Sequence, residues 1–153
     1  MSACPISNSR KTNGRTTPNL AYLLRDFLRE QAGRRFALGQ HDCGLIIADW
    51  IERVTGRDPA APVRGRYHDE ASLIALAGPL GLPRLFDRLL REAGLMRTDD
   101  PQLGDVAILS VMGTDPRGAI RTASGYVMAA PEGLAGIRNL KGVRVLQAWA
   151  LSG

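Results

Sequence analysis

A cysteine near the start of a helix is the residue of this chain best placed to do chemistry. Cys43 follows Asp42 and precedes Gly44 in the string HDCGLIIADWIERVTG. The N–H groups and partial positive charge of a helix N-terminus stabilise a thiolate, and the same N–H groups can bind the oxyanion of a tetrahedral intermediate. We therefore treat Cys43 as a candidate nucleophile and Asp42 as part of its site. The alternative is an inert cysteine on the apolar face of an amphipathic helix.

A nucleophilic thiol needs a general base, and the only histidines of the chain are His41 and His68. His41 precedes the helix and is expected to point away from the face that carries the thiol. His68 reaches Cys43 only if its loop folds back over the helix N-terminus. Both are weak candidate bases, and each is alternatively a surface or loop-ordering histidine. Two histidines and two cysteines without CxxC spacing predict neither a metal site nor a cofactor.

The loop after this helix contains the string RGRY, whose arginines and tyrosine are candidate binding residues. Arg64 and Arg66 can bind a carboxylate or phosphate in a bidentate manner. Alternatively, they pin the loop to acidic neighbours such as Asp49 or Asp58. Tyr67 is most simply an aromatic residue of the core or of its rim.

Hydrophobic periodicity predicts four helices followed by short strands. The expected helices run from Pro18 to just before Gly33, from the N-cap Asp42 to Gly56, and over 71–77 and 83–93. Beyond Pro101, strands are expected over 105–111, 119–122 and 126–129, around 134–137, and within 143–151. Helices followed by strands predict an α+β domain, with the N-terminal helices packed on a C-terminal antiparallel meander.

Composition and charge limit the class of protein. The chain has 153 residues, 44% of them hydrophobic, and a formal net charge of +5. No run approaches the about 20 apolar residues of a membrane span, and the N-terminus lacks the apolar core of a signal peptide. Residues 1–35 contain seven basic and two acidic side chains, whereas residues 36–153 contain thirteen of each. We expect a flexible basic arm over 1–17 and a single domain over 18–153.

Two motifs give the chain a resemblance to a known family. The string DCGL that begins at Asp42, and the Gly-Asp pair at 104–105 that opens an apolar strand, resemble the motifs of NlpC-type cell-wall peptidases. The longer string FALGQHDCGLIIADWIERVTGRDPAAPVRGRY is similar to a family of uncharacterised phage and prophage proteins related to those peptidases. The resemblance covers roughly residues 20–150. It implies a papain-like NlpC-type fold and an association with a phage tail.

The resemblance also implies where the base belongs, and there this chain departs from the family. NlpC-type enzymes carry the histidine at the start of the strand after the Gly-Asp-led one. Aligning RGAIRTASG with that pattern leaves Arg117 at the position of the histidine. A guanidinium is always protonated, so it can neither accept the thiol proton nor protonate a leaving amine. Arg117 is therefore counted with the candidate binding residues.

The resemblance and the missing histidine leave two alternative functions. In the first, the domain is a catalytically degenerate, structural component of a phage tail tip, and its basic arm binds other tail proteins. In the second, it is an active cysteine amidase or peptidase that cleaves peptidoglycan cross-links during genome entry, with Cys43 as nucleophile. The missing histidine favours the first, and the protein is then expected in the virion, or in the host cytoplasm before assembly. No aromatic residue precedes Tyr22 among the arginines, so nucleic acid is the least favoured partner.

Overall fold

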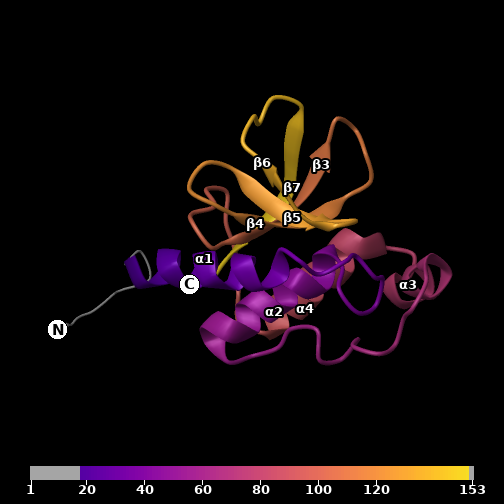
Figure 1. Cartoon of the computed structure of the whole chain (residues 1–153). Coiled ribbons are helices and arrows are strands. Elements are labelled where there is room, and N and C mark those ends of the chain that lie inside the picture. Colours follow the sequence, from indigo (N-terminus) through magenta and orange to yellow (C-terminus); the bar gives the residue numbers. More distant parts are fainter. Residues whose placement is uncertain (1–17, 152–153) are drawn as a thin grey trace.

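Four helices form where apolar residues recur at helical spacing. The structure, a computed structural model, describes residues 18–151 (Figure 1). The helices are α1 (Pro18–Gln31), α2 (Cys43–Thr55), α3 (Glu70–Ala77) and α4 (Gly81–Glu92). Gly56 ends α2 in the left-handed conformation at φ 81°, which glycine adopts without steric cost. Within 18–151, no helix has the length and apolar character needed to cross a bilayer.

The described strands form one antiparallel sheet that follows the helices along the chain. They are β2 (Met96–Arg97), β3 (Val106–Val111), β4 (Arg117–Arg121), β5 (Tyr126–Ala130), β6 (Gly133–Ile137) and β7 (Val143–Ala150). Their order in the sheet is β2-β7-β3-β4-β5-β6, so β3 to β6 form a meander and β7 returns to pair with β3. The expected α+β class is confirmed.

Helices α1 and α2 pack against one face of the sheet, with α2 against β4 and β5, and α3 packs on α4 at the edge of the molecule (Figure 1). The core between the two layers contains Phe27, Trp50 and Trp149, each at most 1% exposed. Burying a large apolar side chain contributes about 1.5–3 kcal/mol. The indole Nε1 of Trp50 also donates a 2.8 Å hydrogen bond to the carbonyl oxygen of Gly104, in the turn before β3. This bond fixes α2, and with it Cys43, relative to the sheet.

Most of the expected segments are confirmed, and the differences are shifted element boundaries and one unexpected short strand. α4 begins at Gly81, two residues before the expected start, and β4 begins at Arg117 instead of Ala119. The two-residue strand β2 was not expected, because it is too short to show a periodicity, and it forms by pairing Met96 with Ala150 of β7. The expectations for residues 1–17 lie outside the described residues.

Candidate functional site

The N-terminus of α2 is capped by Asp42, as the sequence predicted. Oδ1 of Asp42 accepts hydrogen bonds from the backbone N–H groups of Gly44 and Leu45, at 3.0 and 2.8 Å. Both amides were candidates for an oxyanion hole, and both are already bonded to a carboxylate of the protein itself. An anionic substrate oxygen would have to displace that carboxylate before it could use either amide.

The thiol of Cys43 lies in the first turn of α2, packed against the core between the layers. Burial raises the pKa of Cys43, and the negative charge of Asp42 raises it further. Hydrogen bonding from the backbone of Gly118 and the positive charge of Arg117 act in the opposite direction without reversing the shift. Because a raised pKa keeps the proton on sulfur at neutral pH, Cys43 is a thiol and not a thiolate.

The residue of β4 that packs on the first turn of α2 is Gly118, one residue after Arg117. A Cβ atom added to Gly118 would lie 2.5 Å from Cδ1 of Ile47 and 2.7 Å from the carbonyl oxygen of Cys43. Arg117 itself is exposed at the start of the strand. The position beside the cysteine is therefore filled by close backbone packing, with no room for a larger side chain.

Sequence reasoning missed both Gly118 and the aromatic ring that packs beside it. Cζ of Phe86, on α4, would lie 3.1 Å from a Cβ atom added to Gly44, and its Cε2 would lie 3.3 Å from one added to Gly118. Phe86 therefore lies close to both glycines. The available signal was a glycine inside a strand, which marks a close approach of another segment.

His41 is buried, so of the two alternatives to a catalytic base the surface position is wrong and the loop-ordering role remains. The residue is 2% exposed, and neither ring nitrogen has a hydrogen-bond partner among the described residues. Its backbone does order the loop before α2, since its N–H and carbonyl groups both pair with Ala37. Burial lowers the pKa of His41, and the positive charge of Arg34 lowers it further. The imidazole is neutral at pH 7, but it lies within the protein interior and cannot exchange protons with a substrate without a rearrangement.

His68 is an exposed loop residue, in agreement with the surface alternative. Its Nε2 lies 3.4 Å from Oδ2 of Asp69, and its side chain is 83% exposed. Its backbone N–H donates to Oγ of Ser72 in the first turn of α3, so the residue also helps to order this loop. No contact between His68 and the thiol of Cys43 is present.

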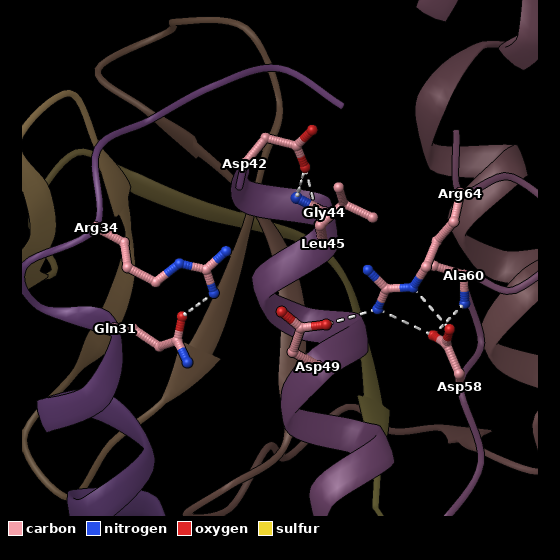
Figure 2. A network of polar contacts seen from close by, with 9 residues as sticks. All are labelled: Gln31, Arg34, Asp42, Gly44, Leu45, Asp49, Asp58, Ala60 and Arg64. Carbon is pink, nitrogen blue, oxygen red and sulfur yellow. Dashed lines mark hydrogen bonds and ion pairs between the residues drawn. The ribbon is translucent and has the colours of Figure 1, made fainter. Parts of the chain in front are cut away.

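Arg64 joins the RGRY loop to α2, which confirms the structural alternative for this residue. Nη2 of Arg64 lies 2.6 Å from Oδ1 of Asp49, and Nε lies 2.7 Å from Oδ2 of Asp58 (Figure 2). Both donors are therefore used within the protein. Arg66, two residues later, is exposed, and its side chain makes a 3.5 Å contact with the carbonyl oxygen of Pro62. No carboxylate of residues 18–151 pairs with it, so the expected pairing with an acidic neighbour is wrong for Arg66.

Tyr67 is buried beside the cap of α2. Its hydroxyl donates a 2.6 Å hydrogen bond to Oδ2 of Asp42, and the side chain is 7% exposed. Tyr67 also lines an apolar cavity of about 50 Å³ between α2, the 59–67 loop and α4. Of the sequence-predicted site residues, the structure thus brings Asp42, Cys43 and Tyr67 together. It leaves Arg66 and His68 on the surface.

Within residues 18–151, no three histidine, cysteine, aspartate or glutamate side chains are grouped so that they could hold a metal ion.

Comparison with known proteins identifies the family of the domain without assigning it a function. A family model described as a domain of unknown function (DUF6950) matches residues 16–151. No curated protein and no solved structure gives a significant match.

Proposed function

The chain belongs to the DUF6950 family, whose function is unknown, and from that premise we propose that it is a catalytically inactive, NlpC-like domain that acts as a structural component of a phage or prophage tail tip. In this proposal the fold is related to that of the cysteine peptidases, and Cys43 is a packing residue. The protein resides in the virion, or in the host cytoplasm before assembly.

The observation that carries the proposal is the packing of Gly118 on Cys43 and Ile47. A cysteine hydrolase needs a base beside the thiol, and the strand residue that lies there has no space even for a Cβ atom. An imidazole at this position would require β4 to move away from α2. The packing at Gly118 is therefore incompatible with a histidine at that position, and the residue before it, where the resemblance places the histidine, is an arginine.

The state of the thiol and its surroundings supports the same conclusion. The raised pKa of Cys43 disfavours the nucleophilic thiolate. The N–H groups of Gly44 and Leu45 bind the carboxylate of Asp42 and stabilise the helix. The two amides that would bind an oxyanion thus serve to cap the helix.

The association with a phage tail rests on the similarity of the DCG helix and the RGRY loop to phage and prophage proteins. The contacts of Arg64 and Tyr67 are consistent with a structural use of that loop, because both side chains tie it to α2. The basic arm over residues 1–17 is proposed to bind neighbouring tail proteins.

A cysteine amidase or peptidase that acts on peptidoglycan is the second candidate. Hydrogen bonding from the backbone of Gly118 and the positive charge of Arg117 both lower the pKa of Cys43 and so favour a thiolate. If a substrate or a partner opened the site and removed the burial, these two groups would help to activate the sulfur.

Infection by phage particles that carry Cys43→Ala separates the two functions without knowledge of the bond that is cleaved. The structural proposal predicts normal particle assembly and unchanged plaque yield. A Cys43→Ala variant that assembles normally but no longer infects would overturn it in favour of the enzyme.

Two measurements on the purified protein complement the infection assay. Iodoacetamide labelling at neutral pH, with each cysteine followed by peptide mass mapping, should be slower at Cys43 in the native protein than in denaturant. The wild-type protein should cause no turbidity loss of purified peptidoglycan. Lysis that Cys43→Ala abolishes with the fold intact would contradict the structural proposal.

Deleting residues 1–17 tests the proposed role of the arm. The shortened protein should be absent from purified particles although it accumulates in the host. Incorporation at the wild-type level would remove the arm from the assembly model and leave the domain itself as the binding element.

A further inference from the structure

α4 carries a line of exposed side chains on the face that points away from the core. Leu80, the N-cap residue of α4, is followed at intervals of four, four and three residues by Arg84, Arg88 and Arg91, which places them on one side of the helix. All four are exposed. The opposite side packs inward through its buried leucines: Leu85, Leu89 and Leu90. We call the four exposed residues the α4 stripe.

The α4 stripe borders a hollow that contains large exposed apolar side chains. The hollow has a volume of about 510 Å³ and lies between the last turn of α3, the turn at Pro79 and α4. Leu80 is 67% exposed at its rim. Ile74 is 62% exposed and lies one helical turn before Ala77, which lines the hollow. Two large apolar side chains, Ile74 of α3 and Leu80 at the N-cap of α4, are therefore exposed near this hollow, and Figure 1 shows α3 at the edge of the molecule.

Two of the three arginines of the α4 stripe carry charge that no carboxylate of the described residues neutralises. Among residues 18–151, no carboxylate forms an ion pair with Arg84 or Arg88, in contrast to the paired Arg53 and Arg64. Arg91 lies 3.6 Å from Asp87, a carboxylate that Arg97 also contacts. Glu92 is the remaining acidic residue at the hollow, so the hollow keeps a net positive charge.

We infer that the α4 stripe and Ile74 form a docking surface for an anionic lipid bilayer. The guanidinium groups of Arg84, Arg88 and Arg91 would bind headgroup phosphates, and Leu80 and Ile74 would enter the boundary between headgroups and acyl chains. An acidic protein segment would match the charges, but it would also need a shape that fits two separate apolar side chains. Acyl chains have no fixed shape and fill an open hollow without such a fit. This inference does not rest on the proposed tail function.

Flotation of the full chain with vesicles of phosphatidylglycerol and phosphatidylcholine in equal parts tests the inference. The wild-type protein should float with these vesicles at about 0.15 M salt but not with vesicles of phosphatidylcholine alone. The double variant Arg84→Gln/Arg88→Gln should partition about 25-fold more weakly, at about fivefold for each arginine. Leu80→Ser should weaken partitioning by about tenfold, because it removes the apolar contribution at unchanged charge.

The matched control is Arg138→Gln/Arg144→Gln, which removes the same charge from exposed positions on the sheet side of the molecule. It should float as the wild type does, and the basic arm is the same in every variant. An absence of wild-type binding would overturn the inference, and so would equal losses in the two double variants, which would indicate binding through overall charge. Capture on immobilised poly-L-glutamate that survives Leu80→Ser, without flotation, would assign the stripe to an acidic protein instead.

Discussion

The hydroxyl of Tyr67 donates a 2.6 Å hydrogen bond to Oδ2 of Asp42, the residue whose other carboxylate oxygen caps α2. The same Oδ2 accepts a 2.9 Å bond from the backbone N–H of Gly39. One carboxylate therefore joins the loop before the helix, the helix N-terminus and the end of the RGRY loop. Burial and the bond to Asp42 both raise the pKa of Tyr67, so its hydroxyl remains a donor throughout the neutral range.

Removing this hydroxyl should destabilise the domain. Tyr67→Phe should lower the free energy of unfolding by about 2 kcal/mol, because the lost bond has a charged acceptor and both groups are buried. Urea denaturation measures the change. Tyr22→Phe is the matched control and should have no effect, since Tyr22 is 55% exposed. Equal stability of the wild type and Tyr67→Phe would show that the bond contributes nothing.

His41 should make the stability of the domain depend on pH. Burial and the charge of Arg34 lower its pKa in the folded state, although Asp49 and Asp42 partly oppose the shift. In the unfolded chain the pKa of His41 is about 6.5, so below this pH the unfolded chain binds a proton that the native protein excludes. The contribution of His41 to stability is therefore complete above that pH and is lost as the pH falls.

Comparing urea denaturation near pH 7.5 and 5.5 tests this prediction. This interval spans the pKa of a histidine in the unfolded chain, which is about 6.5. The wild type should lose stability over it, and His41→Phe should lose less because phenylalanine does not titrate. His68→Gln replaces an exposed histidine and should keep the wild-type dependence. The same pH dependence in the wild type and in His41→Phe would remove His41 as its source.

Arg64 should stabilise the domain more than Arg66, although both belong to the same short string. Arg64→Met breaks the contacts with Asp49 and Asp58 and leaves two carboxylates without their shared partner. We expect a loss of about 1–2 kcal/mol in urea denaturation, since the three side chains are partly exposed and solvent weakens the pairing. Arg66→Met, the matched control, should change stability little. A comparable loss in both variants would indicate a general charge effect.

Gly118→Ala tests the packing on which the proposed function rests. The added methyl group would meet Ile47 and the backbone of Cys43, so the free energy of unfolding should fall by about 1–3 kcal/mol. Gly136→Ala is the matched strand control, because nothing lies within 4 Å of a Cβ atom there. If Gly118→Ala were as stable as the wild type, the strand could accept a side chain beside Cys43, and the packing argument for an inactive site would fail.

Local patterns predicted the α2 region well, for a clear physical reason. The cap at Asp42, the apolar face around Trp50 and the stop at Gly56 are determined by neighbours within a few residues. The pairing of Arg64 with Asp49 and Asp58 was also foreseeable as an alternative, because both carboxylates are close to that loop in the sequence. The burial of His41 was not foreseeable, since it depends on segments that meet only in the folded chain.

The sequence by itself therefore determined the four helices, the α+β class and the position of Cys43 in the first turn of a capped helix. Only the tertiary structure decided that Gly118, and not Arg117, packs beside the cysteine, and that the thiol keeps its proton. The register of β4 against α2 results from side-chain packing across the core, and the pKa of Cys43 results mainly from desolvation by distant segments. Neither quantity is encoded in the residues that flank the cysteine.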